Sequence, residues 1–134
     1  MRQLEVAAAV CVQDGEVFVA QRPDKGETAR KWEFPGGKLE EGESGEEAVM
    51  REIKEELDTV ISVKREIGTV SCQYQTFFLV MHLYLCTPIK GSFTLKEHLA
   101  KKWIGKEEAE SLDWAEADRM ALPLVLPCLA QATV

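Results

Sequence analysis

Residues 36–58 read GGKLEEGESGEEAVMREIKEELD, and this stretch decides the fold more than any other part of the chain. Three of its carboxylates, Glu52, Glu55 and Glu56, fall at positions i, i+3 and i+4. On a helix of about 3.6 residues per turn, these side chains share one face. Apolar residues lie on a different arc of the same helix: Val49, Met50, Ile53 and Leu57. The pattern therefore predicts a helix with one anionic face and one face packed on a core.

The start of this helix is marked by local signals. Ser44, followed three residues later by Glu47, has the spacing of a capping box. Residues 34–37, Phe-Pro-Gly-Gly, predict a rigid turn whose two glycines are free to take positive φ. The expected order is a strand, a glycine turn, a loop and the acidic helix.

The acidic helix has two interpretations. In most charge-rich helices the charged side chains form a solvent-exposed face, which is stabilised by ion pairs between positions i and i+4. Residues 40–58, however, contain nine acidic residues and only Arg51 and Lys54 as basic ones, which is poor balance for such pairing. Combined with the glycine turn, the cluster favours metal binding, and its oxygen ligands suit the hard cations Mg²⁺ and Mn²⁺.

Composition restricts the class of protein. A chain of 134 residues with 46% hydrophobic and 29% charged residues is typical of one globular domain, residues 1–134. It has neither an apolar run of membrane-spanning length nor a signal-peptide layout, so we expect a cytoplasmic protein without a membrane partner. The net charge of −7 disfavours a nucleic acid polymer but allows a small phosphorylated substrate held by cations. The cysteines lack zinc-ligand spacing and are expected as buried free thiols: Cys11, Cys72, Cys86 and Cys128.

The rest of the chain alternates strand and helix patterns. Asp14-Gly15 predicts a hairpin between the first two strands, and Pro88 and Gly91 predict a later loop. The expected strands are residues 4–12, 16–21, 60–70, 76–86 (buried on both faces) and 99–104, with a helical turn at 106–111 and a last helix starting near Asp118 or Pro123. This order predicts an α/β fold with a mixed sheet covered by helices on both sides.

The spacing in residues 36–58 resembles the signature box of the Nudix family. The matching residues are Gly37, Glu43, Arg51, Glu52, Ile53, Glu55 and Glu56. Asp58 and Thr59 depart from the pattern, where the family has glycine and an aliphatic residue. Both lie at the helix end, and Asp tolerates the left-handed conformation, so we expect a slightly strained C-cap and an intact site. Residues 20–23 and 31–38 resemble the MutT-like branch, which implies a Nudix α/β/α sandwich with a catalytic loop-helix-loop.

The resemblance implies an activity and a metal site. Family members of this branch hydrolyse a nucleoside triphosphate to the monophosphate and pyrophosphate, as in nucleotide-pool sanitation, using Mg²⁺ and in some cases Mn²⁺. By the family pattern, the metal ligands are Glu52, Glu55, Glu56 and the backbone carbonyl of Gly36. Arg51 and Glu43 would orient these carboxylates and join loop to helix; the alternative for Arg51 is a surface ion pair of little energetic value.

Further residues are implied at the substrate. Arg22 aligns with a basic residue that contacts substrate phosphate in MutT-like enzymes, although it can equally be an exposed strand end. Lys38 is a weaker phosphate candidate that can also neutralise the acidic cluster, and Phe34 lies in the stretch that resembles the branch. In MutT a glutamate precedes the late tryptophan, but here Lys102 precedes Trp103.

Close relatives instead carry a Glu-His pair several residues earlier, which Glu97-His98 matches. Glu97 is therefore the candidate general base, and His98 would orient its loop. His82 is expected in the core. The tryptophans can stack on a nucleobase, but buried structural roles are more frequent: Trp32, Trp103 and Trp114.

Asp118 is the candidate reader of the base. Residues 114–118 resemble the segment that supplies this side chain in MutT-like enzymes. An ionised carboxylate only accepts hydrogen bonds and so suits the N4 amine of cytosine, which favours (d)CTP or a 5-substituted dCTP. If Asp118 is buried and protonated, it can also donate a hydrogen bond, and oxidised dGTP then becomes an alternative substrate. A structural alternative is that Asp118 caps the last helix.

Two other functions remain as alternatives. A nucleotide sugar or ADP-ribose is a possible substrate, although the short chain disfavours it. A non-catalytic nucleotide-binding module is disfavoured because Glu55 and Glu56 are both retained. The oligomeric state is left open.

Overall fold

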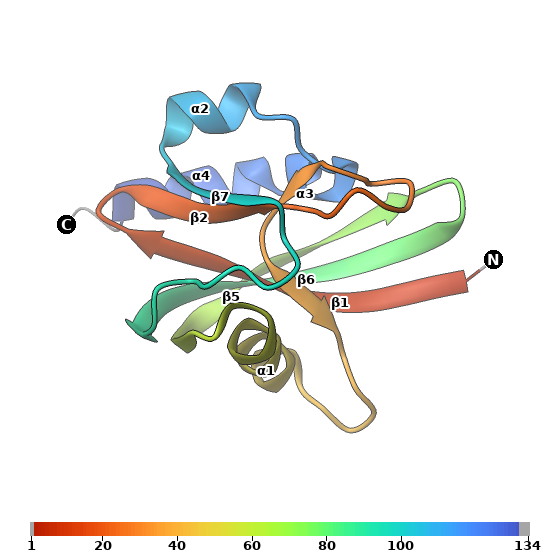
Figure 1. Ribbon diagram of the computed structural model, residues 1–134, viewed down its shortest axis with the longest axis horizontal. Helices are drawn as coiled ribbons and strands as arrows, with labels where there is room; N and C mark the ends of the chain where they lie inside the picture. The colour runs from red at the N-terminus through yellow and green to blue at the C-terminus, as the bar shows by residue number, and fades with distance from the viewer. Residues whose placement is uncertain (1, 132–134) are drawn as a thin grey trace.

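The computed structural model describes residues 2–131. The elements follow in the order β1 (Arg2–Gln13), β2 (Glu16–Gln21), β3 (Trp32–Glu33), β4 (Gly36–Lys38), α1 (Gly45–Leu57), β5 (Val60–Gln73), β6 (Phe77–Lys90), β7 (Ala100–Ile104), α2 (Lys106–Ser111), α3 (Glu116–Met120) and α4 (Leu122–Gln131). Helix α1 lies on one face of the sheet, and α2, α3 and α4 lie on the other (Figure 1). The predicted α/β/α sandwich is confirmed.

The sheet is mixed, as predicted. Its strand order is β3-β2-β1-β6-β5, with β4 also paired to β1 and β7 to β2. The central pair β1 and β6 is parallel, and the other pairs are antiparallel. Between β3 and β4 the chain leaves β2 and joins β1, so residues 33–36 cross from one part of the sheet to the other.

Strand β1 divides its side chains between two cores. Ala7, Ala9 and Cys11 pack with α1, whereas Ala8, Val10 and Val12 pack with α4 and the other helices of that face. This alternation follows from the two-residue period of a strand. The small alanines leave room for α1, which inserts Val49, Ile53 and Leu57 fully buried.

Both ends of α1 behave as the sequence indicates. Ser44 accepts from the Glu47 N–H while Glu47 accepts from the Ser44 N–H, which completes the capping box. Asp58 takes a left-handed conformation (φ 49°, ψ 42°), and its N–H donates to the carbonyls of Ile53 and Lys54. Asp58 therefore closes the helix where the family pattern has glycine.

The glycine turn differs from the expectation. Gly36 and Gly37 form strand β4 and do not adopt positive φ. A Cβ on Gly36 would lie 1.9 Å from the carbonyl oxygen of Ala7, and a Cβ on Gly37 would lie 2.3 Å from Cδ of Glu52. Glycine is required at position 36 because the backbone of β1 lies too close for a side chain, whereas at position 37 the nearest atoms belong to the movable Glu52 side chain.

Three further expectations on β6 are corrected. Pro88 does not start a loop but lies within β6, opposite Ile61, where the ladder with β5 is irregular. The strand is not buried on both faces, because residues 77–80 are only partly buried. His82 is not a core residue: its ring bonds Glu5 (Nε2···Oε2 2.6 Å) and Thr69 (Nδ1···Oγ1 3.0 Å) at a partly exposed site.

The four cysteines are buried and free, as predicted. Between residues 2 and 131, no helix has the length and apolar character needed to cross a membrane.

Candidate active site

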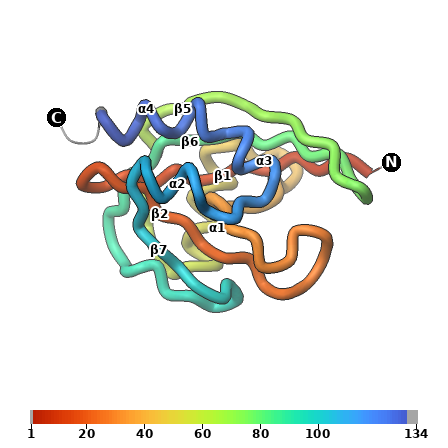
Figure 2. Tube along the Cα trace, turned by 90° about the horizontal axis from the view of Figure 1, so that it is seen from above, coloured from red at the N-terminus to blue at the C-terminus, as the bar shows by residue number. Residues whose placement is uncertain are grey.

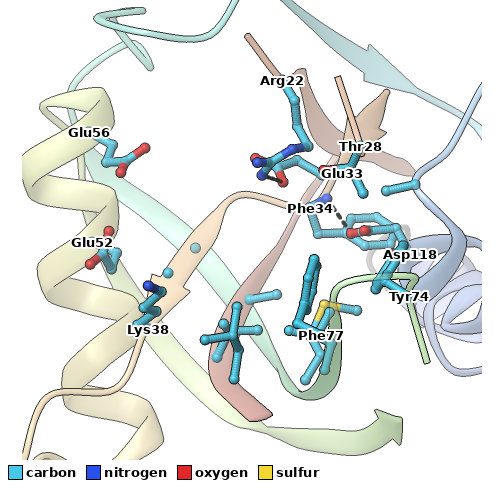
Figure 3. A pocket seen from close by; sticks show the side chains of 18 residues that line it. Arg22, Thr28, Glu33, Phe34, Lys38, Glu52, Glu56, Tyr74, Phe77 and Asp118 are labelled. Atoms are coloured by element: carbon cyan, nitrogen blue, oxygen red, sulfur yellow. Dashed lines mark hydrogen bonds and ion pairs between the residues drawn. The ribbon is translucent and has the colours of Figure 1, made fainter. Parts of the chain in front are cut away.

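A cavity of about 390 Å³ opens beside α1, a volume within the usual range of small-molecule sites. Figure 3 shows Glu52 and Glu56 of α1 on one side and the aromatic side chains with Asp118 on the other. Its lining includes seven of the predicted site residues: Arg22, Phe34, Gly36, Lys38, Glu52, Glu56 and Asp118. Arg51, Glu55 and Glu97 are absent from the lining.

Arg51 joins the acidic helix to the loop before it. Its guanidinium donates to both oxygens of Glu43, at 2.7 and 2.9 Å, to Glu52 at 2.7 Å and to Glu55 at 3.2 Å. It also donates to the carbonyl of Lys38 at 3.1 Å. The bond from Arg51, followed by that from the Glu40 N–H, lowers the pKa of Glu43 to about 2. Arg51 therefore occupies a bridging position between residues 38–43 and α1.

Glu56 has the opposite electrostatic environment. Burial, followed by the charge of Glu52, raises its pKa, and Glu97 and Glu33 act in the same direction. His98 partly offsets this rise. Glu97 is exposed, but its charge reaches Glu56. Negative charge thus accumulates around Glu56, and among residues 2–131 the Arg51 guanidinium pairs with Glu52 and Glu55 instead.

The donor atoms on the α1 side of the cavity are all oxygens, which suits a hard divalent cation. In the described part of the chain, however, no three acidic, histidine or cysteine side chains already surround a common point where an ion would sit. The ion pairs explain this arrangement, because Arg51 holds Glu52 and Glu55 while Glu56 stands apart. The donor types fit Mg²⁺ or Mn²⁺, but the carboxylates are arranged around a guanidinium.

Glu33 is a cavity residue that the sequence reasoning missed. Its carboxylate accepts from Arg22 Nη1 at 2.9 Å and pairs with His98 Nε2 at 2.8 Å. The His98 side chain is 4% exposed, and its Nδ1 has no hydrogen-bond partner within residues 2–131. A charged residue between Trp32 and Phe34 was the available sequence signal. Arg22 therefore faces the cavity as one member of an ion pair.

Asp118 lies buried inside α3, whose N-cap is Ala115, and α4 begins only at Leu122. The helix-cap alternative is therefore wrong. One carboxylate oxygen accepts the backbone N–H of Phe34 at 2.9 Å. Burial, followed by the charge of Glu33, raises the pKa of Asp118 well above its ordinary value. Asp118 can thus present either a carboxylate or a carboxylic acid to the cavity.

The aromatic lining comes from residues that the sequence did not single out. Tyr74 and Phe77 flank the turn between β5 and β6, and their rings stack with centroids 4.8 Å apart. The Tyr74 hydroxyl accepts the Ala117 N–H at 2.9 Å. The tryptophans have structural roles and do not line the cavity: Trp32 contacts Lys102, Trp103 packs on Phe18 and Phe93, and Trp114 donates to Ala109.

The acidic helix and the aromatic residues thus lie on opposite sides of one cavity within an α/β/α sandwich (Figure 3). The sequence matches the NUDIX domain over residues 1–125, and the chain belongs to the Nudix family, among its MutT-like members. It is an enzyme that acts on nucleoside diphosphate-linked substrates.

Three similar proteins support this assignment. The CTP pyrophosphohydrolase of Escherichia coli (strain K12) is 34% identical over 118 residues, which are 88% of this chain and 87% of that protein. The 8-oxo-dGTP diphosphatase of Proteus vulgaris is 36% identical over 97 residues, 72% of this chain and 87% of that protein. The solution structure of the E. coli ORF135 protein superimposes with a TM-score of 0.79 at 33% identity, covering 97% of this chain and 91% of that one.

Proposed function

We propose that the chain hydrolyses a nucleoside triphosphate to the monophosphate and pyrophosphate, with (d)CTP or a 5-substituted dCTP as the favoured substrate. The observation that carries this proposal is Asp118, buried in the cavity lining opposite the acidic helix (Figure 3). The similarity to a CTP pyrophosphohydrolase supports the same base.

We place the divalent cations, Mg²⁺ or alternatively Mn²⁺, at the acidic wall, which is the side of the cavity formed by residues 36–56. Glu52, Glu55, Glu56 and the carbonyl of Gly36 would hold them, with Arg51 and Glu43 keeping the loop against the helix. Bound divalent cations neutralise phosphate charge and lower the pKa of a bound water. The accumulated negative charge around Glu56 supports this placement, because a cation there would relieve the repulsion.

Arg22 and Lys38 are the cavity's basic residues and are proposed to contact the phosphates. Since Glu33 accepts a hydrogen bond from Nη1 of Arg22, the guanidinium is oriented and its remaining N–H groups would be available to an anion. Glu97 is proposed to accept the proton of the attacking water, because its charge already reaches Glu56 from the loop before β7. Phe34 would pack beside the base that Asp118 reads.

A second candidate substrate is 8-oxo-dGTP. The raised pKa of Asp118 favours it, because a protonated carboxyl can donate as well as accept. The similarity to an 8-oxo-dGTP diphosphatase points the same way. The protonation state of one buried carboxyl would then decide between the two bases, with cytosine favoured as the pH rises above its pKa.

The test compares kcat/KM for dCTP, 5-methyl-dCTP and 8-oxo-dGTP, with and without Mg²⁺, in the wild type and in Asp118→Asn. We expect the wild type to prefer a cytosine nucleotide and the variant, which can both donate and accept, to shift toward guanine. The same substrate ranking in both proteins would reject Asp118 as the reader of the base. Failure to split any triphosphate would reject the proposed function itself.

A further inference from the structure

Glu27 joins two segments that are far apart in the sequence. One carboxylate oxygen accepts the Thr76 N–H at 2.9 Å and the Thr76 hydroxyl at 2.6 Å, and the other accepts the Gln75 N–H at 2.8 Å. The donors form the turn between β5 and β6, while Glu27 belongs to the loop at residues 22–31 between β2 and β3. Both segments lie at the same end of the molecule in Figure 2.

The residues beside these bonds line the cavity. Arg22 and Thr28 lie on the loop with Glu27, and Tyr74 and Phe77 flank the turn that Glu27 holds. Figure 3 shows Arg22 and Thr28 on a different side of the cavity from Phe77. The bonds of Glu27 therefore tie two parts of the cavity lining together.

The chemistry of these bonds makes them strong but accessible to solvent. Hydrogen bonds to an ionised carboxylate are about twice as strong as neutral ones. The Thr76 hydroxyl, followed by the two backbone N–H groups, lowers the pKa of Glu27, so the carboxylate stays ionised at neutral pH. Because Glu27 is exposed, water competes for the same groups, and the contact can open without unfolding the sheet. The β5–β6 ladder reaches Gln73 and Phe78 without help from Glu27.

We propose that Glu27 is a positioning residue for substrate binding, which holds the stacked Tyr74–Phe77 pair at the spacing that admits the nucleobase. This inference rests on the proposed function. Without Glu27, the turn keeps the bonds of Tyr74 and Gln73 to the Phe77 carbonyl but loses its bonds to the loop at residues 22–31. The two parts of the lining would then have to be brought together when the nucleotide binds, which weakens binding. The acidic helix does not depend on this contact, so the hydrolytic step would proceed at its usual rate once substrate is bound.

The variants isolate the carboxylate. Glu27→Ala removes all three bonds, and Thr76→Val removes only the hydroxyl donor. Asp24→Ala is the matched control, because it removes one negative charge from the same exposed loop and only breaks a 3.9 Å contact with Arg30. For Glu27→Ala we expect KM to rise about tenfold, the equivalent of about 1.4 kcal/mol, with kcat within about twofold. Thr76→Val should show a smaller rise, and Asp24→Ala should match the wild type.

Amide hydrogen exchange tests the contact without any nucleotide. The N–H groups of Gln75 and Thr76 should exchange about tenfold faster in Glu27→Ala than in the wild type or in Asp24→Ala. Unchanged exchange would overturn the proposal, and so would faster exchange with an unchanged KM. A KM that rises equally in Asp24→Ala would also overturn it, since loop charge would then explain the effect.

A separate measurement distinguishes this inference from the proposed function. If the wild type hydrolyses no triphosphate, calorimetric titration with a non-hydrolysable α,β-methylene analogue of dCTP replaces the kinetic assay. A Kd about tenfold weaker in Glu27→Ala would support the positioning role even though the proposed hydrolysis had failed. An equal Kd in both proteins, or no binding to either, would overturn it.

Discussion

The two walls of the cavity are built in different ways. The acidic wall comes from one continuous stretch, residues 36–56, and Arg51 ties that stretch together through ion pairs. The opposite wall combines Phe34, the Tyr74–Phe77 pair and Asp118, which come from three separate parts of the chain. The contacts there are ring packing and backbone hydrogen bonds. The acidic wall thus comes from a short local motif, whereas the opposite wall is assembled only by the tertiary fold.

This contrast predicts different consequences for mutations in the two walls. Replacing the carboxylates of the acidic wall that line the cavity, Glu52 and Glu56, should reduce turnover whichever base is bound. Changes in the opposite wall should alter the relative use of substrates or the stability of the fold.

The largest effect is expected for Glu56→Gln. Under the proposed function, kcat should fall by about a hundredfold or more, because a cation ligand is lost while the shape remains. The fold should not weaken, since burial and Glu52 already raise the pKa of Glu56 and make its charge costly at neutral pH. Steady-state kinetics with Mg²⁺ and a thermal melt measure both quantities. Glu46→Gln, on the exposed first turn of α1, is the control; near-normal turnover of Glu56→Gln would remove Glu56 from the site.

The adjacent residues Gly36 and Gly37 separate effects on stability from effects on activity. In Gly36→Ala the new Cβ meets the rigid backbone of β1, so we expect a loss of about 2–3 kcal/mol or more in unfolding free energy. In Gly37→Ala the three atoms nearest to the new Cβ belong to the Glu52 side chain, which can move, so activity should fall more than stability. Urea denaturation and kcat measure the pair. Gly105→Ala, with no atom within 4 Å of its new Cβ, is the control; equal destabilisation at 36 and 37 would contradict this interpretation.

A moderate effect is expected for Tyr74→Phe in the opposite wall. The ring and its stacking on Phe77 remain, but the Ala117 N–H loses its acceptor. We expect a loss of about 1 kcal/mol in unfolding free energy with unchanged kcat, measured by denaturant titration and steady-state kinetics. A lower kcat with unchanged stability would show that the hydroxyl takes part in the reaction.

The smallest change concerns the pH dependence of stability. The folded pKa of Glu43, about 2, lies below its ordinary value of 4.5. Its stabilising contribution is therefore fully present above pH 4.5 and is lost as the pH falls toward 2. Glu43→Gln should be less stable than the wild type at pH 7, and the difference should shrink between pH 4.5 and 2. A constant difference across this range, in melts at matched ionic strength, would show that the Arg51–Glu43 pair does not stabilise the fold.

The sequence predicted those features whose causes are local. Ser44 and Glu47 are three residues apart, so the capping box could be recognised from spacing alone. The left-handed C-cap at Asp58 was expected because Asp58 stands where the resembled family has glycine and because Asp tolerates this conformation. The need for glycine at position 36 could not be predicted from the sequence, because the obstructing atom belongs to Ala7 in another strand. His82 was expected in the core because Met81 and Leu83 flank it in its strand. Its hydrogen-bond partner Glu5 comes from the parallel strand β1 and could not be recognised from the sequence. No sequence pattern links Tyr74 and Phe77 with Asp118. Only the tertiary fold brings these three residues into the lining of one cavity.

The parallel pairing of β1 with β6 has a consequence for how the molecule folds. Glu5 and His82, which meet across this pair, are 77 positions apart, so β1 must close a long loop before it gains its partner. The β5–β6 hairpin is local and can form on a microsecond timescale. Strand β4 pairs with β1, so the carboxylates of α1 reach their final place only when the central strand has docked. During synthesis, the acidic segment leaves the ribosome before β6 has been made. We therefore expect the cavity to be one of the last parts of the molecule to be assembled, after β1 has paired with β6.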